Sequence, residues 1–247
     1  MIRKNRSIPV QDLKLLIFDL DGTLVDSRID LANSVNAMLR HYCKPELASD
    51  VIASYIGNGA PMLVRRSLGD PDDENFVQEA LLYFMAYYRE HKLDTTYVYA
   101  GIKEMLDAVA RTRNGASRPS TQGNHAVQMA VLSNKPVIPS QVIVDALGLG
   151  GYFFRVYGGN SFHTKKPDPH GLLTLIEEAN VLYPNDPPIT PPTTVMIGDS
   201  AVDVLTARNC GALSIGCTFG LAPHSLEDAP PTLIAQSACD WPTLLGI

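Results

Sequence analysis

The sequence has few of the features that mark an exported, membrane-bound or thiolate-metal protein. Its 247 residues include only four cysteines, which form no C-x-x-C pair and have no histidine at metal-ligand spacing. No apolar run is long enough for a membrane-spanning helix, and the basic N-terminus lacks the apolar core and cleavage site of a signal peptide. We therefore expect a cytoplasmic protein with reduced thiols and no membrane partner.

Positive charge is also scarce. Lysine and arginine together number 20 against 26 aspartates and glutamates, which gives a formal net charge of -6. This balance argues against nucleic acid as the main partner, although an anionic small molecule could still bind where the local charge is positive. The hydrophobic share of 45% and the charged share of 19% are typical of a globular protein of one or two domains with a full-sized core.

Short apolar runs alternate with amphipathic stretches over most of the chain, which predicts an α/β fold. We expect a Rossmann-like core, in which a parallel sheet has helices on both faces. The predicted strands cover residues 13–18, 125–132, 152–157, 193–198 and 212–217. The predicted helices cover residues 101–111, 141–147, 169–179 and 201–210. Two polar segments rich in Gly, Ser or Pro are expected to be surface loops, at residues 112–124 and 183–192.

The region from Ser27 to Lys92 interrupts this alternation, because it contains no convincing strand. Ser27 is a plausible N-cap, and apolar residues follow it at helical spacing. Further helices are expected at 50–55, 61–68 and 72–92, the last with an apolar stripe of Phe76, Ala80, Tyr83, Phe84 and Tyr87. We predict an inserted α-helical cap domain over residues 27–92 and a catalytic core of residues 1–26 and 93–247.

Polar side chains follow the predicted strands at the points where the strands end. The first strand is followed by Asp19 to Thr23 (DLDGT), the second by Ser133 to Lys135 (SNK), and a later one by Gly198 to Asp203 (GDSAVD). Lys165 and Lys166 precede a predicted helix. Because ligands of open α/β sheets bind at the carboxyl ends of the strands, we expect these groups to share one crevice.

Gathered together, these groups would suit phosphoryl transfer. Asp19 could attack phosphorus and form an aspartyl phosphate. Asp19, Asp199 and a main-chain carbonyl are the hard oxygen ligands that Mg²⁺ prefers. Asp21 would then be free to protonate the leaving group and later to activate water. Two carboxylates so close in sequence can coexist because one would bind metal and the other could hold a proton.

The transferring phosphoryl group also needs donors and a positive charge. Thr23, Ser133 and Asn134 are the expected hydrogen-bonding residues around its oxygens. Lys166 would supply a fixed positive charge there.

Four stretches, DLDGT, SNK, KKP and GDSAVD, resemble the motifs of the haloacid dehalogenase superfamily in the same order and around a helical insert. The longer stretches FDLDGTLVDS, YIGNGAPMLVRRSL and GGNSFHTKKPDP are similar to those of phosphoglycolate phosphatases. The resemblance implies that Lys166, directly before Pro167, is the motif lysine and that the Asp21 main-chain oxygen binds metal. It further implies that Asp19 is the nucleophile, Asp21 the acid/base and Asp199 a metal ligand. Asp203 would be a supporting carboxylate, and the Ser133 hydroxyl would bind phosphate.

Some assignments stay open at this point. Asp203 could hold its loop by hydrogen bonds or touch the metal. Gly57-Asn58-Gly59 could end a cap helix or lie over the active site as a substrate-specificity loop. Arg66 could be solvated or could pair with a substrate carboxylate.

The sequence therefore predicts a Mg²⁺-dependent phosphatase that acts on a small phosphorylated metabolite, as a monomer or a homodimer. By resemblance, the first candidate substrate is 2-phosphoglycolate. A sugar-phosphate mutase of the β-phosphoglucomutase type or a pyrophosphatase could use the same core. A dehalogenase is disfavoured because Asp21 and the metal site would have no purpose, and a non-enzymatic regulator is disfavoured because every motif position is filled.

Overall fold

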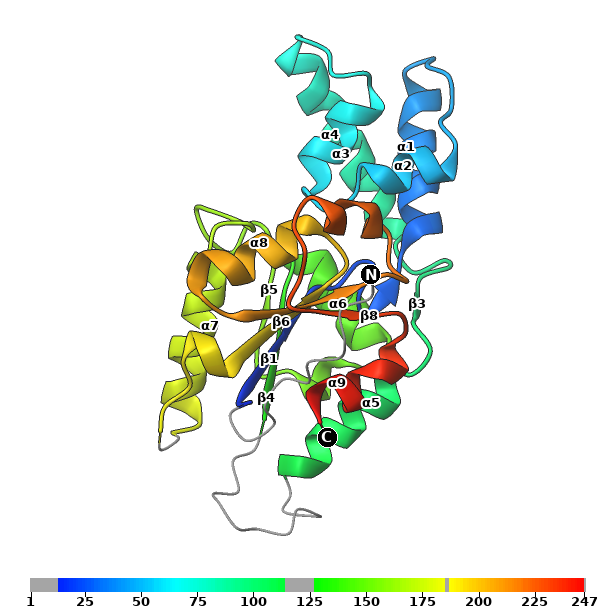
Figure 1. Ribbon diagram of the computed structural model, residues 1–247. Helices are drawn as coiled ribbons and strands as arrows, with labels where there is room; N and C mark the ends of the chain where they lie inside the picture. Colours follow the sequence, from blue (N-terminus) through cyan, green and yellow to red (C-terminus); the bar gives the residue numbers. More distant parts are fainter. Residues whose placement is uncertain (1–12, 114–126, 185–186, 247) are drawn as a thin grey trace.

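The computed structural model describes residues 13–113, 127–184 and 187–246. Six parallel strands form one sheet in the order β5-β4-β1-β6-β7-β8 (Figure 1). They are β1 (Leu15–Phe18), β4 (Gln128–Leu132), β5 (Val156–Tyr157), β6 (Thr194–Gly198), β7 (Leu213–Cys217) and β8 (Leu233–Ala235). The predicted parallel sheet is thus confirmed, with β1 paired on both sides at its centre.

Helices cover both faces of the sheet, as the alternation of strands and helices predicts. The core helices are α5 (Ile102–Arg113), α6 (Val137–Ala146), α7 (His170–Leu182), α8 (Ala201–Cys210) and α9 (Trp241–Leu245). Leu16 and Phe18 of β1 pack in one apolar cluster with α5, α6 and α9, whereas Leu15 and Ile17 pack in another with α7 and α8. The strand is therefore apolar on both faces, which explains its unbroken hydrophobic run.

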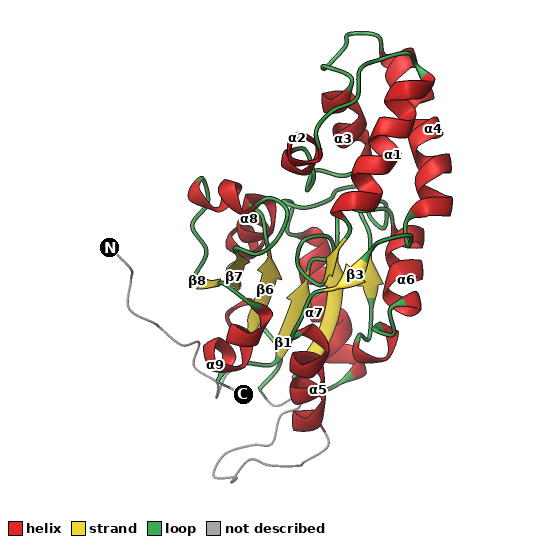
Figure 2. Ribbon diagram, turned by 90° about the vertical axis from the view of Figure 1, so that its right-hand side faces the viewer, coloured by secondary structure: helices red, strands yellow, loops and turns green. Residues whose placement is uncertain are grey.

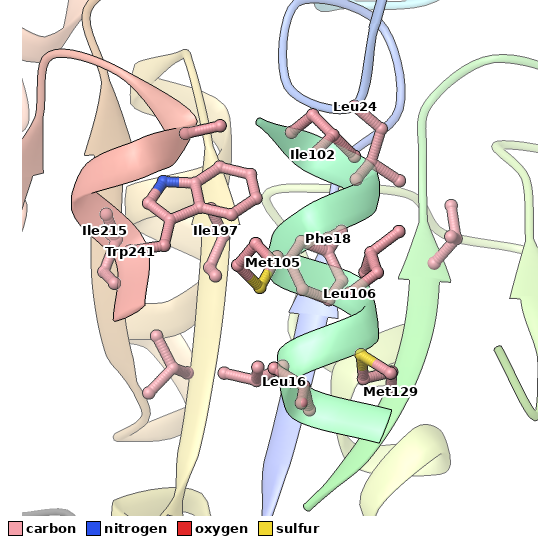
Figure 3. Packing of buried hydrophobic residues seen from close by; sticks show 14 of the residues in the cluster. Leu16, Phe18, Leu24, Ile102, Met105, Leu106, Met129, Ile197, Ile215 and Trp241 are labelled. Carbon is pink, nitrogen blue, oxygen red and sulfur yellow. The ribbon is translucent and has the colours of Figure 1, made fainter. Parts of the chain in front are cut away.

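Phe18 is the last residue of β1 and is fully buried between aromatic neighbours. Its ring centroid lies 5.7 Å from that of Trp241 and 5.9 Å from that of Phe153. Figure 3 shows Trp241 of α9 and Met105 of α5 around this ring. This packing fixes the end of β1 and hence the point at which the chain enters the DLDGT turn.

Four further helices stand over the carboxyl edge of the sheet (Figures 1 and 2). They are α1 (Arg28–His41), α2 (Ser49–Ser54), α3 (Ala60–Ser67) and α4 (Glu74–His91), and together we call them the cap. The cap has an apolar cluster of its own, to which α4 contributes Ala80 and Phe84 from the predicted stripe together with Val77 and Tyr88. The domain boundaries at residues 27 and 92 stay a prediction.

The two chain segments that join the cap to the core pair with each other. Val25–Asp26 (β2) and Tyr97–Val98 (β3) form a small antiparallel sheet that the sequence did not predict. Next to it, the Asp30 carboxylate accepts hydrogen bonds from the main-chain N–H and the hydroxyl of both Thr95 and Thr96, over 2.5 to 3.1 Å. The two segments are therefore held together at the base of the cap.

Several predicted elements need correction. The strand predicted over 152–157 forms only at Val156–Tyr157, because Gly150–Tyr152 is a 3-10 turn. Helix α5 continues to Arg113, and the rest of the loop predicted over 112–124 lies outside the described residues. Ser27 occupies the N-cap position of α1, but its hydroxyl does not cap the helix. None of the helices in the described ranges has both the length and the apolar character required to cross a membrane.

Candidate active site

The predicted crevice exists at the carboxyl edge of the sheet. Asp19, Asp21, Ser133, Asn134, Lys135 and Asp199 line one cavity together with Gly57, Gly59 and apolar side chains of the cap. Because β1, β4 and β6 are neighbours and run parallel, the residues that follow them emerge side by side.

Lys166 lies between two carboxylates. Its Nζ is 2.9 Å from Oδ1 of Asp19 and 2.6 Å from Oδ1 of Asp203, and the side chain is almost completely buried. Burial alone would lower the pKa of Lys166, but Asp19 and Asp203 outweigh it and raise that pKa. Lys166 therefore keeps its positive charge beside Asp19.

The neighbouring Lys165 has a different environment, because its side chain is exposed and reaches the cap. Its Nζ donates a hydrogen bond of 2.8 Å to the main-chain oxygen of Asn58. Of the two adjacent lysines, Lys166 contacts Asp19, whereas Lys165 contacts the cap.

Asp203 holds the loop at the start of α8. Its Oδ2 accepts hydrogen bonds from the main-chain N–H of Ser200 at 3.1 Å and from the Ser200 hydroxyl at 2.7 Å. The sequence left open whether Asp203 holds its loop or touches the metal. These hydrogen bonds show that it holds the loop. The same carboxylate still lies close enough to Asp19 and Asp199 to share a metal ion with them.

Asp199 is anchored by a loop that sequence reasoning missed. Its Oδ2 accepts main-chain hydrogen bonds from Leu221 at 2.6 Å and Ala222 at 3.0 Å. Two glycines make room for this carboxylate: a Cβ atom would lie 2.2 Å from Asp199 Oδ2 at Gly22 and 2.4 Å from it at Gly220. Gly22 also has a φ of +82°, which an L side chain rarely adopts.

The three carboxylates fit a divalent cation. Asp19, Asp199 and Asp203 each offer an oxygen, and these oxygens lie within 4.8 Å of one another. Burial raises the pKa of Asp199 to about 8, with the charges of Asp203 and Asp19 adding to the rise. Burial likewise raises the pKa of Asp19 to about 6, although Lys166 opposes it. Such a cluster favours a bound cation with hard oxygen preference, which would compensate the crowded negative charge.

Asp21 points to a different set of partners. Its Oδ1 accepts a hydrogen bond of 2.5 Å from the Ser27 hydroxyl, and its Oδ2 lies 2.8 Å from Nζ of Lys135. The SNK pattern alone does not predict a role for Lys135. Burial would lower the pKa of Lys135, but the Asp21 carboxylate outweighs it and raises that pKa. The two carboxylates of DLDGT are thus separated by their partners, Asp19 with Lys166 and Asp21 with Lys135.

The predicted phosphate-binding residues fall into two groups. Ser133 and Asn134 line the cavity, whereas Thr23 is fully buried and does not line it. The Thr23 hydroxyl has no hydrogen-bond partner among the described residues. Asn134 uses its amide group to donate 3.0 Å hydrogen bonds to the main-chain oxygens of Gly57 and Lys166.

The cap loop reaches the site, but Arg66 does not line it. Gly57 and Gly59 form part of the cavity wall, and the Asn58 main chain binds Lys165. Arg66 donates a hydrogen bond of 3.0 Å to Oδ1 of Asn58, so its guanidinium supports the loop within the cap. Among the described residues that line the cavity, Lys135 is the cation.

Comparison with known proteins agrees with this geometry. The family model described as haloacid dehalogenase-like hydrolase matches residues 16–217. The chain belongs to this family. The match spans both the core and the cap, and the family identity predicted from the four motifs is confirmed.

Relatives of this haloacid dehalogenase-like hydrolase include phosphatases. Phosphoglycolate phosphatase of Pseudomonas putida is 35% identical over 213 residues, which cover 84% of this chain and 70% of the relative. Phosphoglycolate phosphatase 1 of Pseudomonas aeruginosa is 35% identical over 237 residues, 92% of this chain and 78% of that one. The crystal structure of a predicted phosphoglycolate phosphatase from Haemophilus somnus superposes with a TM-score of 0.81 at 27% identity, over 94% of this chain and 98% of the other. The enzyme class predicted from the sequence, a phosphatase of this family, is confirmed.

Proposed function

We propose that this hydrolase is a Mg²⁺-dependent phosphatase that cleaves a small phosphate monoester, with 2-phosphoglycolate as the first candidate, through an aspartyl phosphate on Asp19. The observation that carries the proposal is the pairing of Asp19 with Lys166 at the end of β1, beside Asp199 and Asp203. A buried carboxylate, a fixed cation and a cluster of hard oxygen ligands are the parts that phosphoryl transfer needs.

In the first step, a carboxylate oxygen of Asp19 forms a bond to phosphorus while the bond from phosphorus to the ester oxygen breaks. Lys166 stabilises the negative charge on the phosphoryl oxygens, and Ser133 donates a hydrogen bond to one of them. Asp21 gives its proton to the departing oxygen. In the second step, the Asp21 carboxylate takes a proton from a water molecule that attacks the phosphorus, which releases phosphate and regenerates Asp19.

The metal would be held by Asp19, the main-chain oxygen of Asp21 and Asp199, with Asp203 supporting the loop. When bound, Mg²⁺ supplies the positive charge that lets a carboxylate approach a phosphate dianion. The apolar cap residues that line the cavity, among them Leu31, Ile56 and Phe84, would exclude water during the first step.

Support for 2-phosphoglycolate comes from the names of the relatives. All groups named here come from one chain, so either a monomer or a homodimer could carry out the reaction. A cytoplasmic location would suit the unpaired state of Cys43, Cys210, Cys217 and Cys239.

The test is phosphate release from a panel of 2-phosphoglycolate, pyrophosphate, sugar phosphates and 4-nitrophenyl phosphate, with Mg²⁺ and with EDTA. We expect 2-phosphoglycolate to be hydrolysed fastest, and only with Mg²⁺. Asp19→Asn should abolish turnover, and acid quenching during turnover should leave a phosphorylated peptide that contains Asp19. Preference for pyrophosphate, or transfer that requires a sugar bisphosphate, would favour the pyrophosphatase or the mutase instead.

A further inference from the structure

Lys135 is a buried lysine at the site to which the proposed mechanism assigns no role. Lys135 is 8% exposed and its ammonium group lies 2.8 Å from Oδ2 of Asp21. The other oxygen of Asp21 accepts the hydrogen bond from Ser27. Both carboxylate oxygens of Asp21 are therefore held by side chains, and these come from different parts of the molecule, the loop after β4 and the N-terminal end of the cap.

The second neighbour of Lys135 belongs to the cap. The ammonium group lies over the ring of Tyr88 at 4.6 Å from its centroid, which is the geometry of a cation–π contact. Tyr88 is on α4, is 2% exposed and lines the same cavity. Its ring therefore limits the positions open to the lysine, so a single side chain connects α4 to Asp21.

We propose that Lys135 is a positioning residue that directs the Asp21 carboxyl group at the leaving-group oxygen, and that Tyr88 holds Lys135 in place for this task. The inference rests on the proposed function, in which Asp21 is the acid and base. Lys135 keeps its protons throughout, while Asp21 gives one to the ester oxygen and later takes one from water. The contact matters because a general acid must lie within hydrogen-bond reach of its target, and a misplacement of about 1 Å can cost on the order of 100-fold in rate.

The test compares leaving groups in single turnovers, with formation of the aspartyl phosphate followed by rapid acid quench. The substrates are 4-nitrophenyl phosphate and an alkyl ester, either 2-phosphoglycolate or the sugar phosphate that is turned over fastest. The alkyl oxygen needs a proton to leave, whereas 4-nitrophenolate is a stable anion and does not. We expect Lys135→Met to slow phosphorylation by the alkyl ester about 100-fold and by 4-nitrophenyl phosphate less than about threefold.

A double variant separates positioning from general damage. If Lys135 acts through Asp21, Lys135→Met should cause no further loss with the alkyl ester once Asp21→Asn is present. Additive losses, or equal losses for both substrates in the single variant, would overturn the inference. If Asp21→Asn slowed phosphorylation equally with the alkyl ester and with 4-nitrophenyl phosphate, the proposed role of Asp21 would be overturned, and the inference with it.

Tyr88 gives an independent variant that leaves both buried charges in place. Tyr88→Leu should reduce the alkyl-ester rate with little change for 4-nitrophenyl phosphate. Tyr87→Leu is the matched control, because Tyr87 is the adjacent residue of α4 and stacks on His91 outside the cavity lining. If Lys135→Met does not fold, this pair decides the question: identical behaviour of Tyr88→Leu and Tyr87→Leu would overturn the inference.

Discussion

Lys165 of the core and Asn58 of the cap are joined by one hydrogen bond, from the Lys165 ammonium group to the Asn58 main-chain oxygen at 2.8 Å. The adjacent Lys166 turns the other way, to Asp19 and Asp203. Two neighbouring lysines of one motif thus serve separate purposes, one in the fixed charge of the site and one in holding the cap loop over it.

Loss of the Lys165 contact should weaken substrate binding more than chemistry. A hydrogen bond to a charged group at an exposed position contributes on the order of 1 kcal/mol, so we expect Lys165→Met to raise KM about fivefold. The value of kcat should stay within about twofold, because Lys166 is untouched. Steady-state kinetics on the preferred ester measures both constants.

The matched control is Lys103→Met, which removes another exposed lysine, on α5 and away from the cavity. It should change neither constant. A fall in kcat for Lys165→Met at constant KM would contradict the role of Lys165 as a cap contact.

Removal of Lys166 should affect stability as well as activity. Lys166→Met leaves the carboxylates of Asp19 and Asp203 without their buried cation, beside the third carboxylate of Asp199. Breaking a buried ion pair from one side costs about 3–5 kcal/mol, or on the order of 10 °C in Tm for a chain of this size. Thermal unfolding in EDTA should show this loss, and added Mg²⁺ should recover part of it.

Lys165→Met serves here as the neighbouring control, and its Tm should stay within about 2 °C of that of the unchanged protein. Activity of Lys166→Met should fall at least about 100-fold even with Mg²⁺, because the fixed charge beside Asp19 is gone. An active Lys166→Met enzyme would refute the assignment.

Without a divalent cation, stability should fall as the pH rises. The folded-state pKa of Asp199, about 8, and that of Asp19, about 6, both exceed the ordinary value of 3.8. Between about pH 4 and pH 8 the folded protein therefore binds more protons than the unfolded chain, so the free energy of unfolding decreases with increasing pH. Thermal scans in EDTA from pH 5.5 to pH 8 should show a decline on the order of 5 °C or more.

A cation competes with protons for the same carboxylates, so Mg²⁺ should raise Tm more at pH 8 than at pH 5.5. Asp199→Asn should flatten the slope seen in EDTA and reduce the effect of Mg²⁺. A slope of the opposite sign would show that these carboxylates are not the groups that crowd the site.

Two glycines with the same φ angle allow the space around Asp199 to be tested. Gly22 and Gly69 both have a φ of +82°, but a Cβ atom would meet Asp199 Oδ2 at 2.2 Å in the first case and nothing within 4 Å in the second. Gly69→Ala should cost only the conformational strain, about 1–2 kcal/mol, and leave kcat/KM unchanged. Gly22→Ala should add displacement of Asp199, with a loss of Mg²⁺ binding and of activity by at least about 100-fold.

Titration with Mg²⁺ by calorimetry and phosphatase assays on both variants measure the difference. Equal activity of Gly22→Ala and Gly69→Ala would mean that Asp199 does not need its observed position.

The sequence predicted best those features that depend on residues adjacent in the chain, such as a buried strand and the carboxylates that follow it. The run from Leu15 to Phe18 is apolar at every position, which is typical of a strand covered on both faces, and the structure places helices on both sides of it. Asp19, Asp21 and Asp199 follow strand ends, so their meeting in one cavity could be expected from topology alone.

Other features depend on contacts between distant residues and left no local signal. Lys135 reaches Asp21 across 114 positions of the chain, and Leu221 and Ala222 reach Asp199 from a loop with no motif. Strand β8 (three residues) and helix α9 (five residues) are too short for a periodic pattern to reveal them. Helical spacing on α4 favoured Tyr87 as a buried residue, whereas the neighbouring Tyr88 is the one that is buried, above Lys135.

The pairing of β2 with β3 affects which folded units could be inserted into the core at this point. Because the chain leaves the core at Asp26 and returns at Tyr97 on two directly paired strands, the two points lie about 5 Å apart. Any folded unit whose ends are adjacent could be grafted at this junction without a change in the register of the sheet beneath it. The cap is therefore an exchangeable unit, while Asp19 and Asp199 follow strands of the sheet that such an exchange does not touch.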